Sequence, residues 1–104
     1  MELFDLINIH VDCKDNKGVK VFYQNELFKS RIIILESNGI IPTCQMETFV
    51  MFLVIKGQIT LHKNNEMTIV KENQLFISEP SYLSMESETG ARILGIQIMQ
   101  KQGN

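Results

Sequence analysis

Apolar and polar positions alternate over short stretches of this chain, and turn residues separate the stretches. β-branched and aromatic side chains are concentrated in them, which is typical of strands. The runs predicted as strands are Val19–Phe22, Ser30–Leu35, Phe49–Ile55, Gln58–His62, Met67–Val70, Leu75–Ser78 and Ala91–Met99. No stretch has a convincing helical period, although residues 22–29 could form one helical turn. The pattern predicts an all-β protein.

Turn signals fall between these runs. They are Ser37-Asn38-Gly39, Lys63 to Glu66, Glu72 to Gln74 and Ser87 to Gly90. Asn tolerates the left-handed backbone conformation that a tight hairpin needs. The chain has 104 residues, which fits a single domain over residues 1–104. We expect residues 1–24 to form an N-terminal β arm that packs onto a small antiparallel barrel formed by residues 25–104.

The run from Phe49 to Ile55 is apolar at every position. A strand with one face in water should alternate, so we expect both faces of this strand to be covered. In a small barrel the outer face must be covered by the N-terminal arm or by another subunit. We therefore expect a homodimer, with cover by the arm alone as the alternative.

Composition and charge narrow the classes of function. The formal net charge of −2 argues against a nucleic-acid partner, which normally selects a basic surplus. The first residues lack the basic start and apolar run of a signal peptide, and no apolar run approaches the ~20 residues of a membrane helix. We expect a cytoplasmic protein without a membrane partner. Cys13 and Cys44 are expected to be two reduced thiols, with Cys44 buried and inert.

The segment from Gly39 to Gly57 resembles the first cupin motif, in which a glycine, two histidines, a glutamate and a second glycine follow at fixed spacing. The stretch from Glu72 to Ser87 resembles the second motif. Together the likeness covers about residues 30–100, and it is carried by the two framing glycines and the rhythm of the strands. The resemblance implies a short single-domain cupin: a small antiparallel barrel, or jelly roll, that is often a homodimer.

The usual chemistry of a cupin is missing from these motifs. A typical cupin holds a divalent metal with three histidines and one glutamate. Here the four ligand positions correspond to Gln45, Glu47, a position near Met51, and Leu83, and the chain has only two histidines. We therefore expect no metal and no cofactor.

Two atypical metal sites remain as alternatives. His62, Glu47 and His10 could form a triad of two histidines and one carboxylate, although His62 beside Lys63 is more simply an exposed residue at a strand end. A soft site for copper(I) could form from Cys44, Met46, Met51 and Met85. Strand alternation argues against the soft site, because it places Cys44 and Met46 on one face and Met51 on the other unless a bulge near Pro42 intervenes.

The residues at or beside the ligand positions are expected to converge on the mouth of the barrel. These candidate ligand-binding residues are Gln45, Glu47, Met51, Tyr82, Leu83 and Met85. The leading hypothesis is a metal-free module that binds or senses a small molecule in a largely apolar pocket. One alternative is an enzyme, related to cupin isomerases or using an atypical metal, with Glu47 as acid or base. The other is a structural or interaction homodimer with a filled interior.

Overall fold

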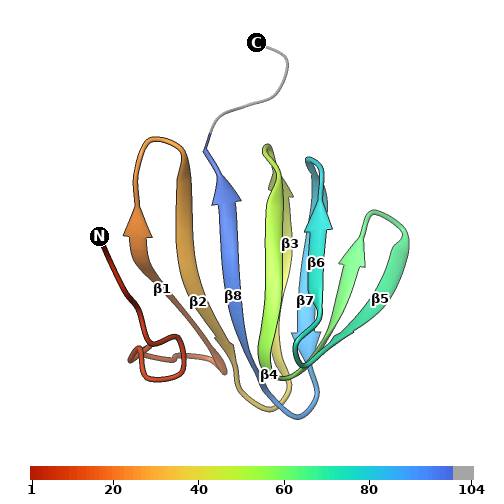
Figure 1. The fold of residues 1–104 in the computed structure, drawn as a ribbon. Helices are drawn as coiled ribbons and strands as arrows, with labels where there is room; N and C mark the ends of the chain where they lie inside the picture. Colours follow the sequence, from red (N-terminus) through yellow and green to blue (C-terminus); the bar gives the residue numbers. More distant parts are fainter. Residues whose placement is uncertain (100–104) are drawn as a thin grey trace.

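A computed structural model describes residues 1–99, and in that part of the chain all regular structure is strand (Figure 1). The strands are β1 (Lys17–Gln24), β2 (Phe28–Leu35), β3 (Gly39–Met46), β4 (Val50–Lys63), β5 (Glu66–Lys71), β6 (Leu75–Ser78), β7 (Ser81–Ser87) and β8 (Ala91–Ile98). All pairings between them are antiparallel. No helix among residues 1–99 is long and apolar enough to cross a membrane. The all-β prediction is confirmed.

The strands form two layers that share β4. The N-terminal half of β4 pairs with β8 and β6, and β2 and β1 continue this first sheet beyond β8. The C-terminal half of β4 pairs with β7 and β5, and β3 closes this second sheet beyond β7. In Figure 1 the sheet curls so that β3 and β7 lie behind β4 and β6. This arrangement is a jelly-roll half-barrel.

The hydrophobic core lies between the two sheets. Alternate residues of each strand point into it, as the pleat of a β-strand requires. The first sheet contributes Ile33, Leu35, Val50, Phe52, Val54, Ala91 and Ile93, and the second contributes Ile59, Leu61, Val70, Leu83 and Met85. The core therefore separates an inner face of each sheet from an outer face.

The long strand β4 joins two runs that the sequence pattern separates. Its register with β8 shifts between Val54 and Lys56, and Gly57 follows with a φ of 81°. A bulge and a left-handed glycine bend a strand and increase its twist. This bend carries β4 from the first sheet into the second.

The N-terminal arm is attached to the first sheet through β8 and β1. Arg92 donates from Nε to the carbonyl of Leu6 at 2.8 Å and from Nη2 to the carbonyl of Ile9 at 2.7 Å. The Phe4 ring lies edge-on to Phe22, with 4.8 Å between ring centroids. Within the expected arm of residues 1–24, only Lys17–Gln24 is a strand, and it pairs with β2.

Some of the predicted turns are confirmed and one is wrong. The turns at Asn38, Asn64 and Asn73 are confirmed, because each Asn has a positive φ of 56–66°. The helical turn at residues 22–29 is wrong, because β1 continues to Gln24. The Asn25 side chain then accepts hydrogen bonds from the backbone amides of Leu27 and Phe28, which makes a tight turn. The strands β3 and β7 were not predicted as apolar runs, because polar residues interrupt both.

Candidate functional site

A cavity of about 120 Å³ lies between the two sheets, at the side where β1 and β2 face β3. Its walls are largely apolar. The residues that line it are Val19, Arg31, Ile33, Ile41, Cys44, Met46, Phe52, Leu83, Ser84 and Met85. The cavity reaches solvent at one side, because two of these residues, Cys44 and Val19, are exposed.

The inner face of β3 is set by a bulge. Ile41 and Met46 both line the cavity although they are five positions apart, which strict alternation forbids. The register of β3 against β7 shifts between Ile41 and Cys44, and the shift reverses the alternation. Pro42 lies within the shift, on a strand at the edge of the sheet, where proline is tolerated. As a result Cys44 and Met46 face the cavity.

Arg31 is the charged residue of this cavity. It lies on the inner face of β2 in phase with Ile33 and Leu35, and it pairs across the sheet with Gly95 of β8. Its Nε atom is buried and has no hydrogen-bond partner among residues 1–99. Burial lowers the pKa of the Arg31 guanidinium from its ordinary value, and the nearby Cys44 acts in the opposite direction. Buried donors are almost always paired in folded proteins, so this atom is an exception that calls for an explanation.

The structure divides the six predicted ligand-binding residues among three places. Leu83 and Met85 line the cavity. Gln45, Glu47 and Tyr82 lie together around a separate surface hollow. Met51 alternates with the core residues Val50 and Phe52, so it lies on the outer face of the first sheet. The expected convergence of all six on one mouth is therefore wrong, because the bulge in β3 turns Gln45 and Glu47 outward.

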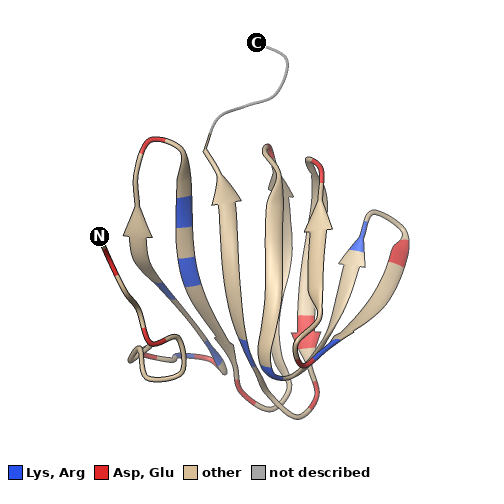
Figure 2. Ribbon diagram, in the orientation of Figure 1, with Lys and Arg blue, Asp and Glu red and all other residues tan. Residues whose placement is uncertain are grey.

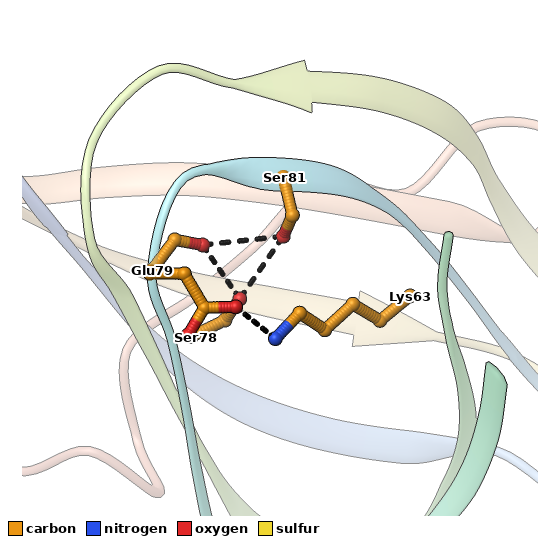
Figure 3. A network of polar contacts seen from close by, with 4 residues as sticks. All are labelled: Lys63, Ser78, Glu79 and Ser81. Carbon is orange, nitrogen blue, oxygen red and sulfur yellow. Dashed lines mark hydrogen bonds and ion pairs between the residues drawn. The ribbon is translucent and has the colours of Figure 1, made fainter. Parts of the chain in front are cut away.

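The separate hollow has a volume of about 440 Å³ and lies where β3 ends and β7 begins. The turn between β6 and β7 contributes Pro80 and Ser81 to its wall. Figure 3 shows the polar contacts of this turn. Ser78 donates from Oγ to the carbonyl of Glu79 at 2.7 Å and contacts the Ser81 hydroxyl at 3.0 Å. Lys63 donates to the Glu79 carboxylate, and this hydrogen bond lowers the pKa of Glu79. This network fixes the turn, and the hollow beside it lies at the surface.

Neither atypical metal site is assembled in full. His62 lies 2.9 Å from Glu86 across β4 and β7, and His10 lies 2.8 Å from Asp12 in the arm. No group of three or more His, Cys, Asp and Glu side chains that could hold a metal ion occurs among residues 1–99. Cys44, Met46 and Met85 do share the cavity, but Met51 does not.

The residues at the cupin ligand positions do not fit a divalent metal. Two of them, Gln45 and Glu47, face away from the cavity, and the third, Met51, lies on the outer face of the first sheet. The fourth, Leu83, is in the cavity but has no ligating atom. The positive charge of Arg31 in the same cavity further disfavours a cation.

Two features of this site were not anticipated. Cys44 is exposed, so the expectation of a buried thiol is wrong; it lies on an edge strand at the mouth of the cavity. Arg31 is not among the residues that the sequence predicts for the site. Its signal in the sequence is a single charge at an inward position of the β-branched run from Ser30 to Leu35, in phase with Ile33.

Comparisons with known proteins establish the fold. No family model matches the chain, and no curated protein matches it. Among solved structures, it is similar to the cupin domain of Cnp3 from Schizosaccharomyces pombe, with a TM-score of 0.82 and 14% identity over 93% of this chain and 73% of that one. A Thermus thermophilus protein gives a TM-score of 0.86 and 13% identity over 94% and 97% of the two chains. A predicted oxalate decarboxylase from Thermotoga maritima gives 0.80 and 13% over 95% and 100%. At these identities the likeness shows the fold alone, and that fold is a cupin.

Proposed function

We propose that this cupin-fold chain is a binding module that holds the apolar part of a small molecule in the cavity between its sheets. The observation that carries the proposal is the cavity itself, with apolar walls and one exposed side. An apolar cavity of about 150 Å³ is known to hold one benzene molecule, so 120 Å³ suits one small ring or a short branched chain. The ligand we propose is accordingly small.

The proposal is preferred to the two alternatives for structural reasons. An enzyme that uses Glu47 as acid or base would need this carboxylate in the cavity, and Glu47 lies at the surface hollow instead. A filled interior is disfavoured by the space that remains between Met46, Leu83 and Phe52. The cupin fold does not help to choose between these functions, because one fold can carry many different activities.

We further propose that the chain acts as a homodimer through the outer face of the first sheet. Two apolar rows cross the accessible part of this face: Leu94, Leu53 and Leu75 in one, and Ile96, Met51 and Ile77 in the other. Ile32, which continues the first row on β2, is already fully buried within the chain. At the β6 edge, Leu75 and Ile77 are 55% and 57% exposed. Figure 2 shows no charged residue along β6 or along the parts of β8 and β4 that form these rows. A second copy offers the same face, so a twofold axis would cover both.

The six methionines provide a test of the binding proposal. Met46 and Met85 line the cavity, whereas Met1, Met51, Met67 and Met99 lie elsewhere in the structure. Met46 also borders the surface hollow, so Met85 is the reporter that is specific to the cavity. With methionine methyl groups labelled with carbon-13, we expect benzyl alcohol at millimolar concentration to shift the Met46 and Met85 signals selectively in a proton–carbon correlation spectrum.

Two matched variants control this experiment. Met46→Trp fills the cavity and should abolish the shift at Met85, whereas Met67→Trp, at an exposed methionine on β5, should leave it unchanged. Shifts that are equal at Met67 and Met85, or no shift at any methionine, would contradict a ligand site between the sheets.

A further inference from the structure

The cavity combines apolar walls with one positive charge that nothing in the described structure neutralises. Its lining contains no acidic residue, and Arg31 forms no ion pair among residues 1–99. The Nε atom is buried without a hydrogen-bond acceptor. A buried donor left unpaired costs about 1–3 kcal/mol, and more when it is charged. Such a group is expected to have its acceptor on a ligand.

We propose that the ligand is a small organic acid whose carboxylate accepts hydrogen bonds from Arg31 while its apolar body lies between the sheets. This inference rests on the proposed function and adds the chemical class of the ligand. Guanidinium and carboxylate match in shape, because two parallel N–H groups can donate to the two carboxylate oxygens.

The charge balance favours a monoanion. Arg31 alone carries charge in the lining, so one negative charge is neutralised, whereas a dianionic phosphate ester would retain an excess. The remaining polar side chains of the lining belong to Ser84 and Cys44 and offer little further neutralisation. A soft cation bound by Cys44, Met46 and Met85 would be repelled by the same guanidinium.

The strand neighbours of Arg31 place it beside the packed side chains of the inner face. Its partner across the sheet on β8 is Gly95, and a Cβ at Gly95 would lie 3.2 Å from Ile33 Cδ1 and 3.3 Å from Phe52 Cε1. The missing side chain therefore makes room for Ile33 and Phe52 beside Arg31. On the other side, Arg31 pairs with Val21 of the edge strand β1, next to the open side of the cavity.

The test compares acids with neutral molecules of the same shape: benzoate with benzyl alcohol, and isovalerate with 3-methyl-1-butanol. Each is titrated while the Met46 and Met85 methyl signals are followed. We expect each acid to bind about 10- to 100-fold more tightly than its neutral partner, as a charge-assisted hydrogen bond provides. Arg31→Met should abolish this preference by weakening the binding of the acids.

Two further variants support the comparison. Arg31→Lys keeps the charge without the planar fork and should give an intermediate preference. Lys71→Gln removes one charge from an exposed position on β5 and should have no effect. Arg31→Met should also raise Tm, because it removes an unpartnered donor from an apolar setting; a purely structural role for Arg31 would lower Tm.

Each outcome has a distinct meaning. If all four molecules bind in the cavity with equal affinity, or if Arg31→Met leaves the affinity for the acids unchanged, the carboxylate inference is overturned while the binding proposal stands. If none of the four shifts Met46 or Met85, the binding proposal itself fails. A fall in Tm on Arg31→Met would place the acceptor of Arg31 within the protein and overturn the inference as well.

Discussion

Gly57→Ala is expected to lower the free energy of unfolding by about 3 kcal/mol or more, against a total of roughly 5–15 kcal/mol for a domain of this kind. A Cβ on Gly57 would lie 2.2 Å from the carbonyl oxygen of Gly90, which is backbone and cannot rotate away. The φ of 81° at Gly57 adds strain for any residue with a side chain. For a domain of this size the expected loss in Tm is roughly 12–24 °C.

Gly95→Ala is the matched control for this prediction. Its Cβ would meet only the ends of the Ile33 and Phe52 side chains, at 3.2–3.3 Å, and these can move. We expect a smaller cost, of about 1 kcal/mol, which is the low end for adding one methyl group to a packed core. Urea denaturation of both variants measures the difference. Equal losses at the two glycines would show that the bend in β4 does not depend on Gly57.

Leu53→Glu is expected to convert the proposed homodimer into a monomer. Leu53 lies in the middle of the apolar row formed with Leu94 and Leu75, and a twofold axis places two new carboxylates in the same interface. Burying like charges costs several kcal/mol, so we expect the dissociation constant to rise about 100-fold or more. The core-facing neighbours Phe52 and Val54 are unchanged, so the fold should persist.

Light scattering after size exclusion measures this effect. The wild-type chain, of 12.0 kDa, should give twice that mass at micromolar concentration, and Leu53→Glu should give the single mass. Ile69→Glu places the same charge at a 48% exposed position on β5, in the second sheet, and should remain dimeric. A wild-type monomer, or a monomer produced by Ile69→Glu alone, would contradict an interface on the first sheet.

The apolar run from Phe49 to Ile55 illustrates how far sequence reasoning reached. Its lack of alternation predicts a strand that is covered on both faces; the strand is confirmed, and the cover of its outer face by a second copy stays a prediction. The structure resolves the run into Val50, Phe52 and Val54 in the core and Met51, Leu53 and Ile55 on the outer face, which is half-buried. The pattern of apolar residues identifies such strands because the burial of each position selects an apolar side chain there. What covers the outer face depends on how copies of the chain assemble, and the sequence pattern carries no information about that.

The site was predicted less well than the fold, and β3 explains why. A one-residue bulge reverses every side chain that follows it, so the positions counted from Gly39 placed Gln45 and Glu47 inward when they face outward. Pro42 was the available signal, because proline within a strand indicates an edge or a bulge. Arg31 was missed for a different reason: whether a charge on a strand is paired depends on neighbours from other strands, which only the folded chain brings together.

The most direct measurement is a crystal structure of the protein grown with benzoate. We expect the aromatic ring between Met46, Leu83 and Phe52, with the carboxylate oxygens within hydrogen-bonding distance of the Arg31 guanidinium. An interior closed by its own side chains, or benzoate bound away from Arg31, would contradict this expectation.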